Sequence, residues 1–152
     1  MSAGRRSLPL ILAAALLAGA CSRRDTEPFF PIGMFAVHSP EALKTIKAEG
    51  FNAFQAYPRE PAKLEPLARE AQRLGLRMLA HPHGLLDAGG PAPRWPKAAW
   101  YLQDEPDVVK TAPEALSALS ARVKAWDPST PTTFVVGDGR AAARIAARGE
   151  IL

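Results

Sequence analysis

Residues 51–80 read FNAFQAYPREPAKLEPLAREAQRLGLRMLA, and this stretch decides the fold class. Its middle part, Pro61–Leu74, has apolar side chains at helical spacing and stops at Gly75, which predicts an amphipathic α-helix. The apolar segments on either side, Phe51–Tyr57 and Leu76–Ala80, predict β-strands. A strand, a helix and a second strand joined by short connections predict a βαβ unit with parallel strands.

The same alternation extends in both directions along the chain. We expect one helix that begins with Ser39 as N-cap and ends at Gly50, and another that begins with Thr111 as N-cap. The Gly- and Pro-rich stretch 85–97 predicts no clear helix. Further strands are expected at Phe30–Val37, Ala98–Gln103 and Thr132–Val136, followed by a helix at Arg140–Arg148 and the opening of a sixth strand at residues 150–152.

These elements predict an α/β protein with about five βα units plus the start of a sixth strand. Such units form either an open doubly wound sheet or part of a (β/α)8 TIM barrel. A complete barrel has eight units and typically about 250 residues, whereas this chain has 152 residues. We therefore expect residues 29–152 to form an incomplete barrel if the barrel alternative holds. Its open sheet edges predict self-association.

The first twenty residues have the pattern of a secretory signal peptide. Arg5 and Arg6 precede an apolar stretch, Leu8–Leu17, and small residues follow at 18–20. The single cysteine, Cys21, comes directly after Ala-Gly-Ala, which resembles the bacterial lipoprotein lipobox. The resemblance implies a signal peptide at 1–20, a lipidated Cys21 at the mature N-terminus and a tether at 21–28. Such a lipoprotein is membrane-anchored without spanning the membrane, in the periplasm or at the cell surface.

The charge of the chain argues against a nucleic-acid partner. The formal net charge is +4, but without Arg5 and Arg6 the chain keeps 17 basic against 15 acidic residues. Clusters of Lys and Arg with interleaved aromatic residues are absent from the sequence. The sequence therefore predicts no nucleic-acid partner, and it shows no requirement for a cofactor.

Polar side chains follow each predicted strand at its carboxyl end. Because the carboxyl ends of parallel strands meet at one edge of a sheet, we expect a ligand site there. All three histidines of the chain belong to this set. The set comprises His38, Gln55, Tyr57, His81, His83, Asp104, Glu105 and Asp138.

The fourth predicted strand ends in two acids, within the segment AWYLQDEPD at 99–107. A carboxylate at the edge of a buried site loses hydration, which raises its pKa and suits it to general acid catalysis. Glu105, just before Pro106, is the candidate for this role. The alternative is that the acidic segment is a solvated loop that caps the following helix.

Four segments together resemble the first half of a glycoside hydrolase-type (β/α)8 barrel. They are PIGMFAVHSPEALKTIKAEGFNAFQAY at 31–57, GLRMLAHPHG at 75–84, AWYLQDEPD at 99–107 and DPSTPTTFVV at 127–136. The resemblance is to bacterial secreted proteins related to the retaining β-glycosidase clan that includes the β-galactosidase and agarase-like families.

This resemblance implies a role for each residue at the strand ends. Glu105 would be the acid/base residue, and Asp104 would stand in the place of an asparagine that touches the sugar's 2-hydroxyl. In that clan the nucleophile comes from strand seven, which lies beyond the predicted units. The remaining residues would line sugar subsites: His38, Gln55, Tyr57, His81 and His83.

Two other functions fit the same residues. One is a non-catalytic carbohydrate-binding remnant, or a truncated fragment, that lacks the nucleophile strand. The other is a metal-dependent hydrolase in which His81 and His83 share a metal ion that His38 and Asp104 help to hold. Trp95, expected in a loop above the barrel, is either a platform for a sugar ring or a loop anchor.

Overall fold

The computed structural model describes residues 29–140 of the chain. The expected signal peptide, Cys21 and the tether lie outside these residues, as do the expected sixth strand and all but the first residue of the expected helix at 140–148. No helix in the described part of the chain is long and apolar enough to cross a membrane.

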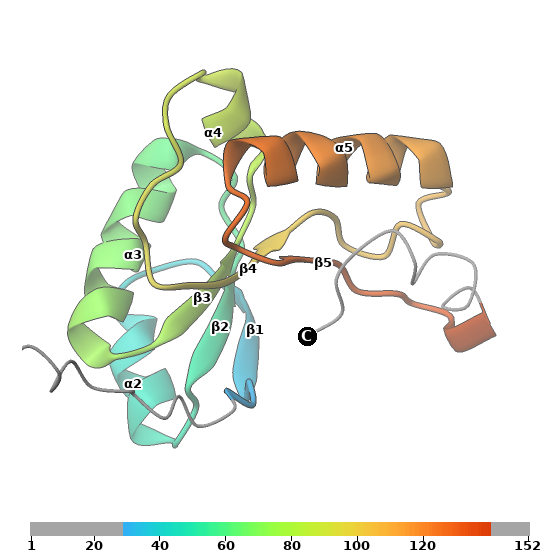
Figure 1. Ribbon diagram of the computed structural model, residues 1–152. Helices are drawn as coiled ribbons and strands as arrows, with labels where there is room; N and C mark the ends of the chain where they lie inside the picture. Colours follow the sequence, from blue (N-terminus) through green and yellow to red (C-terminus); the bar gives the residue numbers. More distant parts are fainter. Residues whose placement is uncertain (1–28, 141–152) are drawn as a thin grey trace, which may run out of the picture. The chain divides into compact units, whose positions relative to one another are not determined.

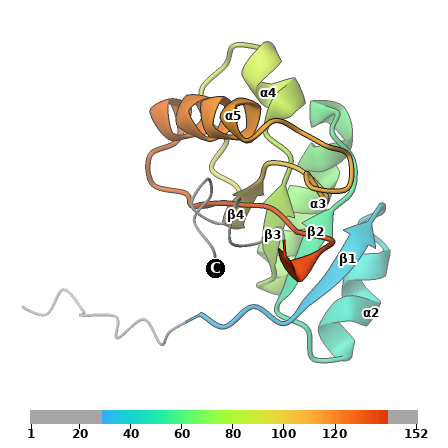
Figure 2. The same ribbon diagram turned by 90° about the vertical axis from the view of Figure 1, so that its right-hand side faces the viewer.

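Five parallel strands form one open sheet in the described residues, with the order β1-β2-β3-β4-β5 (Figures 1 and 2). The strands are β1 (Gly33–Val37), β2 (Ala53–Ala56), β3 (Arg77–Ala80), β4 (Lys97–Tyr101) and β5 (Thr132–Thr133). The helices between them are α2 (Ala42–Ala48), α3 (Pro61–Leu74), α4 (His83–Asp87) and α5 (Pro113–Trp126). The prediction of an α/β fold with alternating strands and helices is confirmed.

The strand order explains where the helices lie. In a doubly wound sheet the strand order reverses and helices cover both faces, whereas each strand here pairs with its neighbour in sequence. Right-handed connections between strands in sequential order all cross the same face of the sheet. Accordingly, buried residues of α2, α3 and α5 join a single hydrophobic core with residues of the sheet.

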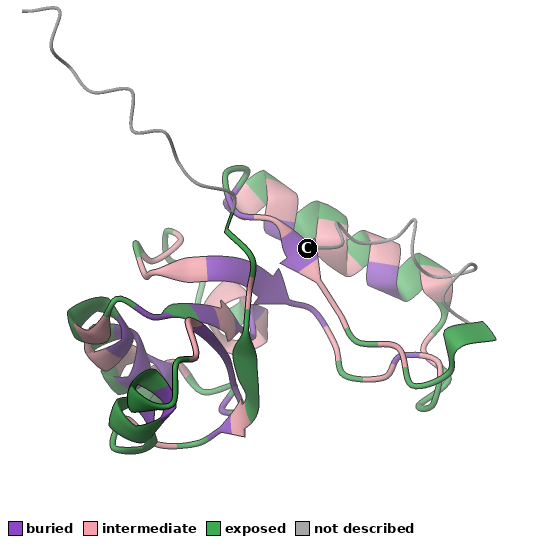
Figure 3. Cartoon of the chain, turned by 90° about the horizontal axis from the view of Figure 1, so that it is seen from below, coloured by how far each residue is buried: buried purple, intermediate pink, exposed green. Residues whose placement is uncertain are grey.

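That core forms from alternate side chains of the inner strands. Side chains alternate between the two faces of a strand, and Phe54, Met78 and Trp100 are the large, fully buried side chains of β2, β3 and β4 in this core. Leu64 and Leu67 of α3 are fully buried in the same core. Burying one such side chain stabilises a protein by about 1.5–3 kcal/mol. The outer strand β1 is largely exposed beside these buried strands (Figure 3).

Helix α3 agrees with its prediction at both ends. Pro61 is its first residue, where a missing backbone N–H costs nothing. Gly75 ends it in the left-handed conformation, with φ of 65°, and its N–H bonds to carbonyl groups of the last turn. Pro61 and Gly75 therefore mark the start and the end of this helix where the sequence predicted them.

Two of the predicted helix caps are wrong. The N-cap positions of α2 and α5 are Glu41 and Ala112, and neither makes a side-chain hydrogen bond to its helix. The two predicted caps, Ser39 and Thr111, bond elsewhere. The Ser39 side chain bonds to the carboxylate of Glu41, and the Thr111 hydroxyl accepts a hydrogen bond from Gln103 Nε2 at 2.6 Å.

Three further elements differ from their predictions. The short helix α4 lies at the start of the stretch that was expected to have none. Strand β4 ends at Tyr101, and β5 covers only two residues, because the pairing between them continues no further than the hydrogen bond from Leu102 N–H to the Thr133 carbonyl at 2.8 Å. Asp104 and Glu105 therefore lie in a loop after β4 and do not end the strand.

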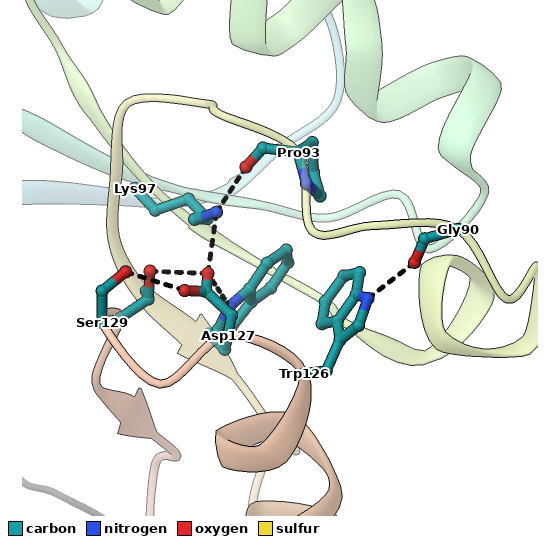
Figure 4. Close-up of polar contacts among 8 residues, drawn as sticks. Gly90, Pro93, Lys97, Trp126, Asp127 and Ser129 are labelled. Carbon is teal, nitrogen blue, oxygen red and sulfur yellow. Dashed lines mark hydrogen bonds and ion pairs between the residues drawn. The ribbon is translucent and has the colours of Figure 1, made fainter.

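A buried ion pair joins β4 to the segment after α5 (Figure 4). Lys97 Nζ lies 2.9 Å from Asp127 Oδ2, and both side chains are 7% exposed. The same carboxylate accepts hydrogen bonds from Trp100, Ser129 and Thr130. Although burial raises the pKa of Asp127, the hydrogen bonds together hold this pKa well below its usual range. This network is structural and lies away from the polar strand ends.

Candidate functional site

A pocket of about 610 Å³ lies at the carboxyl ends of β1, β2, β3 and β4. Polar residues at the carboxyl ends of the predicted strands were selected from the sequence, and we call this criterion the strand-end rule. The pocket brings together five of the residues that it selected: His38, Gln55, Tyr57, His81 and Asp104. Six lining residues were not selected from the sequence: Phe35, Pro58, Arg59, Glu60, Lys63 and Tyr101. Three selected residues do not line it: His83, Glu105 and Asp138.

The buried side chain of Gln55 connects three neighbouring strands. Its Oε1 accepts a hydrogen bond from the Ala36 N–H at 3.0 Å, and its Nε2 donates to the Ala56 carbonyl at 2.9 Å. The same Nε2 lies 3.2 Å from Nε2 of His81. Because an amide nitrogen only donates, the ring nitrogen of His81 must accept. The proton of the neutral ring is therefore on Nδ1.

The residue that Gln55 holds on β1 has an unusual backbone. Ala36 has a φ of 57°, in the left-handed region, and the pairing of β1 with β2 shifts register between Met34 and Val37. Irregularities of this kind turn the chain and redirect side chains next to binding sites. The bond from Ala36 to Gln55 thus fixes the strand between two lining residues, Phe35 and His38.

Burial keeps His81 neutral. The residue is 3% exposed, and this burial, with the charges of Arg59 and His83, lowers its pKa to about 4. The Gln55 amide acts in the same direction, because a protonated ring would place an N–H against an N–H. Nδ1 of His81 has no hydrogen-bond partner within residues 29–140.

His83 is the first residue of α4 and lies outside the pocket. Its ring centroid is 6.2 Å from that of His81, and burial is the main cause that lowers its pKa. Within the described residues, no three histidine, cysteine or acidic side chains lie close enough to hold a metal ion together. The metal alternative needs His81, His83, His38 and Asp104 in one cluster, so the geometry does not favour it.

Aromatic rings form two sides of the pocket. The rings of His38 and Tyr57 contact each other with a centroid distance of 4.3 Å and a tilt of 35°. Those of Phe35 and Tyr101 meet nearly edge to face at 6.2 Å. Tyr57 is 54% exposed and Phe35 is 49% exposed. Both therefore present flat apolar area to a ligand.

Tyr101 and Asp104 form a polar pair at the same pocket. The Tyr101 O–H donates to Asp104 Oδ1 at 2.8 Å. Burial, followed by this hydrogen bond and the charge of Asp104, raises the pKa of Tyr101 far above its usual range. Tyr101 is therefore a neutral donor, and Asp104, which is exposed, offers its carboxylate to a ligand.

Glu105 lies beside the pocket residue Asp104 but faces another segment. Its backbone φ is 41°, and its carboxylate lies against Gly137, where an added Cβ would be 3.2 Å from Oε1. Nearby, the Asp107 carboxylate accepts hydrogen bonds from the N–H groups of Gly137 and Asp138 at 3.0 and 2.8 Å. The acidic loop after β4 is thus bound to the segment after β5.

The connection between β2 and α3 forms the remaining side of the pocket. Arg59 and Glu60 lie in it, and Lys63 of the first turn of α3 makes an ion pair with Glu60 at 3.2 Å. The connection packs closely on α4, because a Cβ added at Gly84 would lie 2.7 Å from the Arg59 carbonyl oxygen. Arg59 and Glu60 are the second and third residues after the predicted strand, so extending the strand-end rule by three residues would have found these two.

Trp95 has a structural role in the described part of the chain. Its Nε1 donates a hydrogen bond to Glu65 Oε2 of α3 at 2.9 Å, and the residue does not line the pocket. Of the two alternatives for this tryptophan, the loop anchor agrees with the structure.

Comparisons with known proteins assign no family to the chain. No protein-family model matches its sequence, and no curated protein matches it. The fold and the site therefore define an α/β protein with an open parallel sheet and a polar, aromatic pocket at the carboxyl ends of its strands.

Proposed function

We propose that the protein binds carbohydrate in the pocket at the carboxyl ends of β1 to β4. The observation that carries this proposal is the combination of exposed aromatic rings and oriented polar groups around about 610 Å³. Tyr57 and Phe35 offer flat surfaces to the C–H faces of sugar rings, and Asp104 offers an acceptor to sugar hydroxyl groups.

The strand order supports a relationship to glycoside hydrolase barrels. In a (β/α)8 barrel each parallel strand also pairs with its neighbour in sequence, the helices lie on one side, and ligands bind at the carboxyl ends. Together with the resemblance of residues 31–57, 75–84, 99–107 and 127–136, this order leads us to propose that residues 29–152 are the N-terminal part of such a barrel.

Hydrolysis with Glu105 as general acid/base is a second candidate function. One observation favours it: a non-glycine residue with a φ of 41° next to a pocket residue, since strained backbone concentrates at functional sites. Glu105 would give its proton to the glycosidic oxygen as the bond to the sugar breaks. A retaining enzyme also needs a second carboxylate about 5 Å away. Because Glu105 does not line the pocket in the described residues, non-catalytic binding of carbohydrate stays the better supported form of the proposal.

The sequence further supports a membrane anchor. We propose that a lipid on Cys21 holds the protein on a membrane facing the periplasm or the cell exterior. Replacing the thiol in Cys21→Ser is expected to move the protein from the membrane fraction to the soluble fraction. Unchanged fractionation of this variant would contradict the anchor.

Isothermal titration calorimetry with a panel of oligosaccharides tests the binding function. Tyr57→Ala is expected to weaken binding by about threefold to tenfold, because stacking on an aromatic ring is lost. Phe30→Ala is the matched control, since Phe30 is 76% exposed and does not line the pocket. If no saccharide binds, or if Tyr57→Ala binds as well as the unchanged protein, the binding function is wrong.

The same proteins separate binding from hydrolysis. With aryl glycosides as substrates, the hydrolytic candidate predicts release of the aryl alcohol that disappears in Glu105→Gln. Glu114→Gln, on the first turn of α5 and away from the pocket, is the control. Saccharide binding that is unaffected by Glu105→Gln, without turnover of any aryl glycoside, would leave the binding remnant as the function.

A further inference from the structure

We infer that the ligand of this pocket is an acidic saccharide whose carboxylate binds the guanidinium of Arg59. The inference rests on the proposed carbohydrate-binding function and adds the charge of the ligand to it. It follows from the charges of the lining residues, from the way the Arg59 backbone is held and from the placement of opposite charges around the pocket.

The Arg59 guanidinium makes no ion pair within the described residues. It lines the pocket but takes part in none of the ion pairs formed there. The other cation of the lining, Lys63, pairs with Glu60 at 3.2 Å. A guanidinium at a pocket wall without a carboxylate partner has paired N–H donors that can bind both oxygens of a ligand's carboxylate.

The field of Arg59 extends across the pocket to the end of β3. After burial, its charge is the largest cause that lowers the pKa of both His81 and His83. Helix α3 begins at the same corner with Glu60 as its N-cap residue, so the Glu60 carboxylate offsets the positive potential of the helix dipole there. A ligand carboxylate would give Arg59 the ion-pair partner that it does not have among the described residues.

The protein holds the Arg59 backbone in place before any ligand arrives. Pro58 is buried on one side, and Pro61 starts α3 on the other. The Arg59 N–H donates to Glu60 Oε2 at 3.2 Å, and its carbonyl packs against Gly84. Because the backbone is fixed, binding through the side chain loses less conformational freedom than it would from a mobile loop.

The placement of charge around the pocket favours a ligand that is acidic at one end only. Asp104 lines the pocket as well as Arg59, and its exposed carboxylate repels anions and accepts hydrogen bonds from hydroxyl groups. A uronic acid unit has one carboxylate and several hydroxyl groups on the same ring. It can place the carboxylate on Arg59, hydroxyl groups on Asp104 and its apolar ring face on Tyr57.

The test compares pairs of sugars that differ in one group. Methyl uronides and the corresponding methyl glycosides, in the gluco, galacto and manno series, differ only by a carboxylate in place of a hydroxymethyl group. In at least one series the full chain is expected to bind the uronide about tenfold more tightly, as a charge-assisted hydrogen bond allows. The preference should weaken as salt concentration rises, because Arg59 is exposed.

Variants of Arg59 test whether this residue causes the preference for the uronide. Arg59→Gln is expected to remove the preference for the uronide. Arg59→Lys is expected to keep part of it, since a lysine retains the charge but not the paired N–H donors of a guanidinium. Arg69→Gln is the control, because Arg69 lies on α3, the helix that follows Arg59, pairs with Glu65 and does not line the pocket. Thermal unfolding of each variant checks that it is folded.

The possible outcomes separate this inference from the proposed function. Equal or tighter binding of the neutral glycoside in every series, or a preference that survives Arg59→Gln, would overturn the inference and leave carbohydrate binding in place. Tighter binding of the matching sugar 6-phosphate than of the uronide would overturn the assignment of a carboxylate. If neither neutral nor acidic sugars bind, the proposed function itself is wrong.

Discussion

Gln55 decides which ring nitrogen of the neutral His81 side chain carries the proton, through the arrangement of its own amide. The Ala36 N–H fixes which end of the amide is the oxygen, so the nitrogen faces His81. The sequence predicted that Gln55 and His81 would be near each other, because both follow from the strand-end rule. It could not predict the bond between them, since this depends on the register of β2 with β1 and β3.

Removing the Gln55 amide should destabilise the fold. In Gln55→Leu the half-buried Ala36 N–H and the buried His81 Nε2 both lose their partners. We expect a loss of up to about 1–3 kcal/mol in the free energy of unfolding for each group left unsatisfied. Urea denaturation at neutral pH measures it. Gln72→Leu, at an exposed position on α3, should change stability little. Equal stability of the two variants would contradict the role of the amide.

His81 predicts a pH dependence of stability. Its pKa is about 4 in the folded protein, against about 6.5 in an unfolded chain. Between these values the unfolded state binds a proton that the folded state does not, so the free energy of unfolding falls as the pH drops from about 6.5 to about 4. The contribution of this residue reaches about 3 kcal/mol.

Two measurements check this dependence. Urea denaturation at a series of pH values should show a steeper loss of stability for the unchanged protein than for His81→Leu over that window. NMR titration of the His81 ring should show no protonation until the pH approaches 4. A ring that titrates near pH 6.5 would contradict the prediction.

Among the elements, those that carry their own start and stop residues could be predicted well. Helix α3 has Pro61 at its first position and Gly75 after its last, so its bounds depend on local residues alone. Strand β4 was predicted two residues too long, because its end depends on how far the distant β5 continues beside it. The cap of α5 failed for a similar reason, since Thr111 bonds to Gln103.

The contact between α4 and the β2–α3 connection predicts that a larger residue at position 84 destabilises the fold. Gly84→Ala would place a Cβ about 2.7 Å from the Arg59 carbonyl oxygen, so one backbone must move. We expect a loss of about 1–3 kcal/mol in the free energy of unfolding, together with weaker ligand binding because Arg59 shifts. Gly90→Ala is the control, since nothing lies within 4 Å of its added Cβ. Similar denaturation curves for the two variants would contradict this packing.

The buried ion pair between β4 and the segment after α5 predicts a large loss of stability when its acid is removed. Asp127→Ala would leave the buried Lys97 ammonium unpaired, with an expected loss of about 3–5 kcal/mol. Asp87→Ala, which removes the exposed partner of Arg122 at 3.9 Å, should cost no more than about 1 kcal/mol. Thermal and urea unfolding compare them. A small effect of Asp127→Ala would show that the network does not hold these elements together.

For the molecule as a whole, the sequence predicted the fold class and much of the pocket, but not the strand order. Alternating apolar and helical segments establish parallel βα units, and the strand-end rule then places five lining residues on one side. Whether a sheet is sequential or doubly wound depends on which edge each new strand joins, and residue patterns within one unit do not record this. Phe35 and Tyr101 were not predicted to line the pocket, because they are apolar or aromatic residues within β1 and β4.

The outer strand β1 predicts the association behaviour of the protein. Ile32 and Met34 are 52% and 40% exposed at or beside this edge, and exposed apolar edges pair with other chains. We expect the protein to self-associate, and Met34→Lys to shift it toward the monomer in sedimentation velocity experiments. Val109→Lys, at a site 60% exposed in the loop after β4, is the control. Equal association of the two variants would contradict a role for the edge.

Sequential strand order also has a consequence for how the chain acquires its structure. Each strand from β2 to β5 adds to the edge left by the strand before it, so none has to wait for a segment that emerges later from the ribosome. The sheet can therefore assemble from its amino-terminal edge while translation is still in progress, and the walls of the pocket are completed in the order in which they are synthesised.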